Sequence, residues 1–171
     1  MSMVGCFLLV RPEVVEALLA NPSRITELLE HAYEDHGKDM VDVDKAWHCL
    51  HYLLTGTAWE GEFPANFMIG GGTEVGDVDV GYGPARVFGT AEVAEIARLL
   101  ATLRGSDLAE RFDARDMERR DIYPGGHPGG WSETDVSSDE SFGYFIGAFE
   151  DLKALVTRGA AGGSGMVAWL N

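Results

Sequence analysis

Apolar residues along this chain follow two different spacings, and each spacing predicts a different kind of element. The run at residues 3–10, MVGCFLLV, is short and continuous, which is typical of a strand buried on both faces. The run at residues 166–170, MVAWL, predicts a closing strand of the same kind. Between the two runs, several segments carry an apolar residue at every third or fourth position, which predicts amphipathic helices.

Four helices follow from that helical spacing. The first begins near Pro12, because proline fits the first turn of a helix, and the second follows the cap and proline of Asn21-Pro22. We expect Thr90 to cap the third helix, and Gly162-Gly163 to end the fourth. The apolar residues that define their inner faces are Val14, Val15, Leu18 and Leu19, then Ile25, Leu28, Leu29 and Ala32, then Val93, Ile96, Ala97, Leu100 and Leu103, and finally Phe142, Phe145, Ile146, Phe149, Leu152 and Val156.

Residues 42–56, DVDKAWHCLHYLLTG, predict one more helix, and this one carries candidate chemistry at its border. Asp42 should cap its N-terminus, and Gly56 should end it in a left-handed conformation. The residues of its buried stripe are Val43, Ala46, Trp47, Leu50 and Leu54. Asp44, His48 and His51 fall along one side of that stripe on successive turns, so we expect them to line its rim.

The middle of the chain is rich in glycine, and we expect turns there with little regular structure. Gly70-Gly71-Gly72 and the run 76–83 are expected to be turns with little regular structure between them, and short strands are expected before them at 66–69 and after them at 85–88. Residues 108–117 predict one or two short helices, and residues 33–39 and 121–137 predict loops. Strands and helices do not alternate regularly, which favours an α+β fold class over a doubly wound one. We therefore predict one compact α+β domain over residues 1–171, with a mixed or antiparallel sheet in which the first and last strands are close.

Four sequence features together resemble the YfbM-like family of bacterial domains of unknown function. They are the segment DVDKAWHCLHYLLTG, GYGPAR at 81–86, DIYP at 121–124 and the terminal apolar strand that contains Trp169. The likeness spans nearly the whole chain and keeps the order of the motifs. It implies a single α+β domain from the bacterial cytoplasm, and it implies no catalytic residues, because the family has no agreed activity.

Composition and charge narrow the classes of partner. The 171 residues are 46% hydrophobic, which is enough to build a core and argues against disorder. Thirteen Lys and Arg residues against 28 Asp and Glu residues give a net charge of −15, which disfavours binding to nucleic acid or to an anionic membrane. A basic protein partner or a small ligand remains open, and so does the reading that the charge only keeps the protein in solution.

Two cysteines, Cys6 and Cys49, are too few for a disulfide scaffold and suit a cytoplasmic location. Gly5-Cys6 resembles a lipoprotein cleavage site, but no basic and apolar leader precedes it. No apolar run approaches the roughly 20 residues that a membrane-spanning helix needs.

His48, His51 and Asp44 are the candidate catalytic residues. A carboxylate beside an imidazole can raise its basicity and fix its tautomer, as a general base or a metal ligand requires. Most zinc-binding helices, however, space two histidines by four residues, and no HExxH motif occurs. The alternative is structural, with His51 beside Trp47 at the edge of the core and His48 paired with Asp44 on the surface. We predict no metal, because the histidine spacing does not match these motifs, and no cofactor, because the glycine loops lack the Lys-Ser/Thr of a phosphate-binding loop.

Tyr82, Arg86, Tyr123 and Trp131 are the candidate binding residues, since exposed aromatics and an arginine in an acidic protein suit recognition of a ligand or partner. Arg86 has a second reading, in which it binds internal carbonyl or carboxylate groups and shapes the glycine loop. Altogether the sequence favours a non-catalytic binding or interaction protein with an acidic surface. The alternatives are a small hydrolase or metal-binding enzyme that uses His48, His51 and Asp44, and a small-molecule sensor that uses the glycine loops. The oligomeric state stays open.

Overall fold

A single antiparallel sheet forms the centre of the fold in the computed structural model, which describes residues 3–34, 37–125 and 139–171. The strands are ordered β2-β1-β5-β4-β3 across the sheet, and every pairing between neighbours is antiparallel. Their bounds are Gly5–Val10 for β1, Met40–Asp42 for β2, Thr73–Asp79 for β3, Pro84–Phe88 for β4 and Gly165–Leu170 for β5. The antiparallel form of the expected sheet is the one found.

The two strands expected from continuous apolar runs lie side by side in the middle of this sheet. β1 and β5 pair along their full lengths, from Gly5 opposite Leu170 to Val10 opposite Gly165. The expected proximity of the first and last strands is therefore confirmed. Five of the six residues of β5 are buried, as the continuous apolar pattern predicts for a strand covered on both faces.

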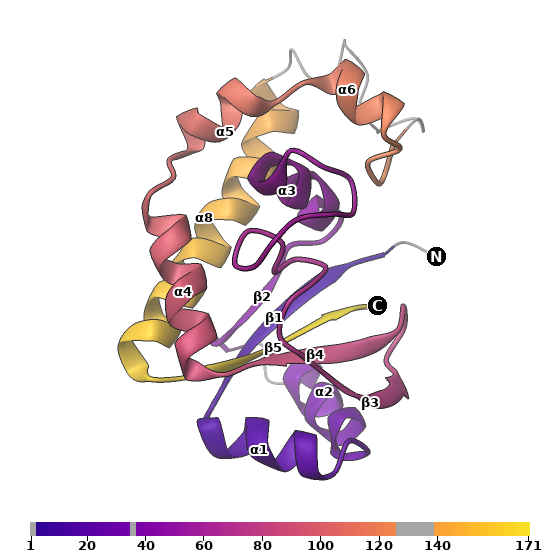
Figure 1. The fold of residues 1–171 in the computed structure, drawn as a ribbon, viewed down its shortest axis with the longest axis vertical. Helices are drawn as coiled ribbons and strands as arrows, with labels where there is room; N and C mark the ends of the chain where they lie inside the picture. Colours follow the sequence, from indigo (N-terminus) through magenta and orange to yellow (C-terminus); the bar gives the residue numbers. More distant parts are fainter. Residues whose placement is uncertain (1–2, 35–36, 126–138) are drawn as a thin grey trace.

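Helices cover both faces of the sheet, and more of them cover one face than the other (Figure 1). Their bounds are Pro12–Ala20 for α1, Arg24–Glu34 for α2, Ala46–Thr55 for α3, Thr90–Ala101 for α4, Gly105–Arg111 for α5, Ala114–Arg119 for α6 and Asp139–Gly162 for α8. The short α1 and α2 lie on one face, whereas α3, α4 and α8 cover the other. The expected α+β fold class is confirmed. Among the described helices, none is both long enough and apolar enough to cross a bilayer.

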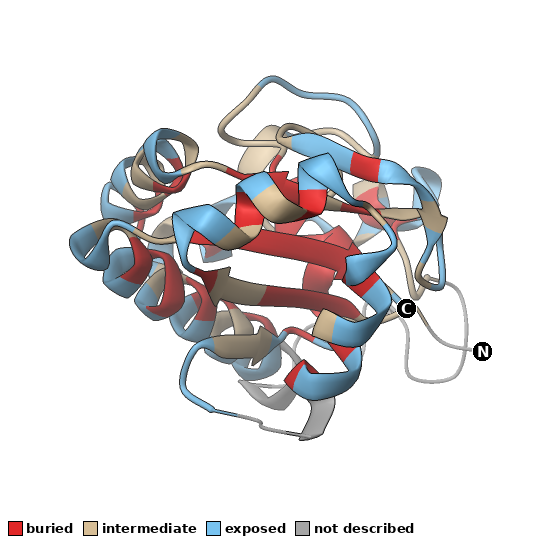
Figure 2. Cartoon of the chain, turned by 90° about the horizontal axis from the view of Figure 1, so that it is seen from below, coloured by how far each residue is buried: buried red, intermediate tan, exposed pale blue. Residues whose placement is uncertain are grey.

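Alternation along the strands divides the apolar side chains between two separate cores. On β5, Met166 and Ala168 pack with the helices α3, α4 and α8, whereas Val167 and Trp169 pack toward α1 and α2. Figure 2, which views the molecule from the side of α1 and α2, shows the buried strands beneath the exposed outer faces of the helices. The core under α3, α4 and α8 is the larger of the two and contains the tryptophan of the 42–56 segment, Trp47.

The start of the 42–56 helix differs from the prediction. Asp42 belongs to β2 and pairs opposite Cys6, and its Oδ1 accepts the N–H of Asp44 at 2.6 Å. Asp44 itself turns the chain with a φ of +47°, and α3 begins only at Ala46. The predicted cap was wrong because the edge strand takes Asp42 before the helix begins. The predicted end is confirmed, since Gly56 has a φ of +76° and its N–H reaches the Tyr52 carbonyl.

Burial of α3 also differs from the prediction. Every residue from Ala46 to Leu53 is buried, so the helix has no solvent-exposed border over that span. Its apolar stripe faces the sheet and α8, and the residues after Gly56 fold back over its other side. The segment is a fully covered helix because later parts of the chain supply a cover that its own sequence does not reveal.

Other differences concern elements on the edge of the sheet and the ends of helices. Residues 66–69 form turns rather than a strand, and β3 occupies part of the stretch expected to lack regular structure. β3 is an edge strand with only Val75 fully buried, so it lacks the continuous apolar signal. Gly89, and not Thr90, holds the cap position of α4, where Glu92 accepts its N–H at 2.7 Å. Leu19, expected to face inward, is 44% exposed.

Gly5 is required where α3 crosses β1. A Cβ on Gly5 would lie 2.7 Å from the Cβ of Trp47, whose ring is fully buried. We expect Gly5→Ala to lower the free energy of unfolding by about 1–3 kcal/mol, because the helix must move away from the strand. Gly147→Ala is the matched control, since a Cβ at this exposed position of α8 meets no atom within 4 Å. It should gain about 0.5–1 kcal/mol from helix propensity. Urea denaturation of both variants makes the measurement, and equal stabilities would contradict the close contact.

Candidate functional site

His48 is fully buried, and backbone groups occupy both of its ring nitrogens. The N–H of Tyr123 donates to Nδ1 at 2.8 Å, so Nε2 carries the proton and donates to the Ala58 carbonyl at 2.7 Å. This tautomer is assigned from the two partners. Burial lowers the pKa of His48, which keeps the ring neutral at pH 7. His48 therefore joins α3 to two loops that are far apart in the sequence.

His51, one turn further along α3, makes a parallel contact. Its Nε2 donates to the Glu60 carbonyl at 3.1 Å, and its buried Nδ1 has no hydrogen-bond partner among the described residues. Burial is the main reason that the pKa of His51 falls to about 4, and the nearby His48 adds to the effect. Both histidines are thus neutral donors to carbonyl groups two residues apart in the following loop.

Asp44 does not join the histidines, which corrects the predicted Asp–His pair. Its carboxylate accepts the hydroxyl of Tyr144 at 2.9 Å, and Asp44 precedes the helix rather than lying one turn before His48 on it. The His48–Asp44 contact of the structural alternative is absent for the same reason. Within the described ranges, no three His, Cys, Asp or Glu side chains are arranged to hold a metal ion.

The loop held by the two histidines presents an exposed tryptophan, Trp59, which no sequence pattern marked as a candidate. Trp59 lies between the two captured carbonyls of Ala58 and Glu60 and is 60% exposed. Its ring centroid is 4.3 Å from that of His48, whose ring in turn stacks on Trp47 at 4.7 Å with an interplanar angle of 6°. Trp59 is therefore the outermost ring of a stack that runs into the core.

Hydroxyl groups add further bonds within the same loop. The Thr57 hydroxyl donates to the Glu60 carbonyl at 2.5 Å, and the Thr57 N–H donates to the hydroxyl of Thr55 at 3.2 Å. The Glu60 carbonyl thus has two donors, one from the loop and one from His51. The loop that carries Trp59 is held at several points on both sides of the ring.

The sequence left two roles open for Arg86, and the structure shows the internal one, in which Arg86 binds carbonyl groups of its own chain. Its guanidinium donates to four carbonyl oxygens in the turn before β3, those of Phe67, Met68, Gly70 and Gly71. Burial lowers the pKa of Arg86 to about 10, so the group remains charged at pH 7. The glycine-rich turn therefore folds around one cation, and its carbonyl groups point inward at that cation.

The other predicted binding residues do not gather in one place. Tyr123 is partly buried, stacks near Trp47 at 5.8 Å and accepts the N–H of Met3 through its hydroxyl. Tyr82 is 42% exposed in the turn between β3 and β4, where its N–H donates to the Leu170 carbonyl. Trp131 lies outside the residues that the structure describes.

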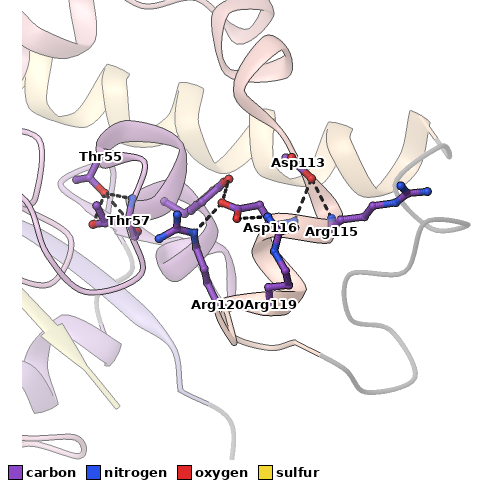
Figure 3. A network of polar contacts seen from close by, with 8 residues as sticks. Thr55, Thr57, Asp113, Arg115, Asp116, Arg119 and Arg120 are labelled. Carbon is purple, nitrogen blue, oxygen red and sulfur yellow. Dashed lines mark hydrogen bonds and ion pairs between the residues drawn. The ribbon is translucent and has the colours of Figure 1, made fainter.

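A polar network that no sequence pattern indicated connects α3 to α6 (Figure 3). The carboxylate of Asp116 accepts from the Tyr52 hydroxyl at 2.8 Å and from Arg119 and Arg120 at 2.7 Å each. The bond from Arg119, followed by those from Tyr52 and Arg120, lowers the pKa of Asp116 to about 2. Asp113 caps α6 by accepting the N–H groups of Arg115 and Asp116. This network orients α6, a short surface helix, because Asp116 of that helix bonds to Tyr52 of α3 while it pairs with Arg119 and Arg120.

Comparison with known proteins places the chain among domains of unknown function. Residues 1–169 match the family described as Domain of unknown function (DUF1877). The chain belongs to this family. It is also similar to the crystal structure of YfbM from Escherichia coli, a protein of unknown function, with 23% sequence identity and a TM-score of 0.75. The match covers 98% of this chain and 99% of YfbM, and at this identity it establishes the fold alone. No curated protein matches the sequence. The resemblance to the YfbM-like family is thereby confirmed.

The buried histidines should make the stability of this DUF1877 domain depend on pH. Their pKa values are lower in the folded state than the ordinary 6.5, so below that pH the unfolded chain takes up protons that the folded chain does not. The contribution of the two neutral rings to stability is therefore fully present above about pH 6.5. The free energy of unfolding should fall as the pH is lowered toward 5, by at most about 1.4 kcal/mol per pH unit for each ring. Urea denaturation at a series of pH values measures this slope. His51→Gln should flatten it, since the amide keeps a donor near the Glu60 carbonyl and does not titrate. A wild-type stability that stays constant from pH 6.5 to pH 5 would contradict the neutral, buried assignment.

Arg86 should be essential for stability, because four carbonyl groups lose their donor without it. We expect Arg86→Met to lower the free energy of unfolding by about 2–5 kcal/mol. Arg98→Met provides the control, since Arg98 is an exposed residue of α4 with one 3.3 Å bond to its own helix, and its loss should cost less than about 0.5 kcal/mol. Thermal or urea denaturation compares the two variants. Similar losses of stability would contradict the conclusion that the hydrogen bonds of Arg86 hold the glycine-rich turn in place.

Proposed function

We propose that this protein is a non-catalytic binding domain that recognises a basic segment of another protein, with Trp59 at the centre of its contact surface. The observation that carries the proposal is the capture of the carbonyl groups on both sides of Trp59 by two buried histidines. An exposed tryptophan on a loop held in this way has little conformational freedom left to lose on binding. Tryptophan is also among the residues that most often dominate the energy of protein interfaces.

Charge supports a basic partner. The chain carries a net charge of −15, and Glu60 and Glu62 are exposed within three residues of Trp59. A lysine or arginine placed over an indole ring gains about 0.5–2 kcal/mol from the cation–π interaction, and adjacent carboxylates favour the same cation. The combination selects a basic side chain rather than a neutral or acidic one.

The hydrolase and metal-enzyme alternative draws little support from the geometry. Both nitrogens of His48 hold backbone groups, so the ring has no lone pair left for a substrate or a metal ion. The turn around Gly70 and Gly71 directs its carbonyl oxygens to Arg86, whereas a cradle for an anion needs N–H groups directed at the ligand. We therefore favour binding over catalysis, and over a sensor that uses this loop.

We extend the proposal to a cytoplasmic location. Cys6 and Cys49 are buried in different cores on opposite faces of the sheet, so a disulfide between them would require the fold to rearrange. Such cysteines suit a reducing compartment.

A set of labelled peptides tests the proposal. Three fluorescein-labelled 15-residue peptides with net charges of +5, 0 and −5 and the same aromatic content are titrated with the protein at 50 and 300 mM NaCl, and anisotropy reports binding. We expect the basic peptide alone to bind, more weakly at the higher salt. Trp59→Ala should weaken that binding at least tenfold, because loss of a central tryptophan costs about 2 kcal/mol or more.

Tyr82→Ala is the matched control, since Tyr82 is another exposed aromatic on a different turn. It should leave the affinity for the basic peptide unchanged. A loss caused by Tyr82→Ala and not by Trp59→Ala would move the contact surface to the β3–β4 turn and refute the role of Trp59. Equal binding of the acidic and basic peptides would refute the charge selection.

A further inference from the structure

A hollow lies on the face of the sheet opposite α3, between α1 and α2. It measures about 330 Å³ and is half-open to solvent. Apolar side chains line it, chiefly Val14, Ala17, Leu18 and Leu28. A second half-open hollow of about 510 Å³ lies between α2 and the β1–β2 edge of the sheet. The two hollows share the lining residues Leu28 and His31, so they adjoin along α2, and we call the pair the α2 groove.

Incomplete cover over the smaller core explains why the α2 groove is apolar. Among the residues that the structure describes, the helices on this side are the nine-residue α1 and the eleven-residue α2, and several apolar side chains beneath them are only partly buried. Leu8 and Met40 line the far end of the groove, and Val14 and Leu28 line the near end. The surface thus offers apolar area without a partner from the described chain.

Acidic residues border the apolar floor. Glu13 and Glu27 line the hollow between the helices, and Asp39 lines the hollow at the sheet edge. Arg24 is the opposing cation within the first hollow, so three carboxylates face one guanidinium along the groove. A ligand that complements this lining carries an apolar stripe with positive charges beside it.

We propose that the α2 groove binds a short amphipathic helix of a partner protein, with basic residues flanking its apolar face. The eleven residues of α2 span about 16 Å at 1.5 Å per residue, which matches about three turns of a bound helix. Helices that bind in grooves place apolar anchors at positions i, i+3 or i+4, and i+7, and two joined hollows suit two such anchors. Trp59 does not line the groove and packs against Trp47 of the other core, so this inference does not rest on the proposed function.

Filling the groove tests the proposal. The probe is a fluorescein-labelled 15-residue helical peptide with leucines at i, i+4, i+7 and i+11 and lysines at the flanking positions. Ala17→Arg places a long cationic side chain in the first hollow, and Ala20→Arg places the same side chain on α1 at an exposed position outside the lining. We expect anisotropy titrations to show at least tenfold weaker binding for Ala17→Arg and unchanged binding for Ala20→Arg.

Removing the bordering charges tests the charge selection separately. Glu13→Gln with Glu27→Gln removes two carboxylates of the groove, whereas Glu16→Gln with Glu30→Gln removes two exposed carboxylates of the same helices outside it. The first pair should weaken binding of the lysine-flanked peptide severalfold at low salt, and the second pair should have a smaller effect. A peptide with glutamates in place of the lysines should bind more weakly than the lysine peptide.

Several results would overturn the proposal. One is binding that is undetectable at 1 mM peptide, and another is equal binding by Ala17→Arg and Ala20→Arg. Self-association of the wild type that Ala17→Arg abolishes would identify a second copy of this chain as the occupant, against the proposal. Trp59→Ala should leave binding of the helical peptide intact, so failure here is distinguishable from failure of the proposed Trp59 surface.

Discussion

The fold depends on one antiparallel pairing, that of β1 with β5 at the centre of the sheet. Because alternate residues of a strand point to opposite faces, this pair divides the apolar side chains between two cores. α1 leaves directly from the end of β1 and begins the cover on one face, whereas the long α8 covers the other face and leads into β5. Both candidate binding surfaces follow from this division. Trp59 is anchored to the helices of the larger core, and the α2 groove remains where the smaller core has too little cover.

Backbone carbonyl groups without a sheet partner impose a second constraint, and side chains satisfy it. The chain between α3 and β3 contains turns and no strand, so its inward carbonyls need donors from elsewhere. His48, His51 and Arg86 supply them, two in the part that holds Trp59 and one in the glycine-rich turn that follows. Residue types that suggest catalysis in the sequence thus act here as donors to the backbone. Their hydrogen bonds hold the loop at both sides of Trp59, and the proposed contact surface depends on that support.

The sequence predicted the elements whose signal is local. The periodicity of the aromatic stripe located α8, and continuous apolar runs located β1 and β5, because each pattern lies within the element itself.

The candidate site was less predictable. Burial of His48 depends on residues 58 and 123, which no pattern within 42–56 contains. Trp59 lies in a loop with no periodicity, and the α2 groove arises from two helices and a strand edge. Asp44 lies at a helical spacing from His48 in the sequence, but α3 begins only after Asp44.

The central position of β5 has a consequence for how the chain folds as it is synthesised. A ribosome makes β1 before the described helices and β5 after them, so the β1–β5 ladder cannot form until those helices have been made. Until then β1 and β4 both lack their shared neighbour, and the apolar faces of the helices between them have no completed sheet to cover. Nascent chains in this state expose unpaired strand edges, which is the condition that chaperones recognise and aggregation exploits. The topology therefore delays cooperative folding of this sheet until β5 has left the exit tunnel.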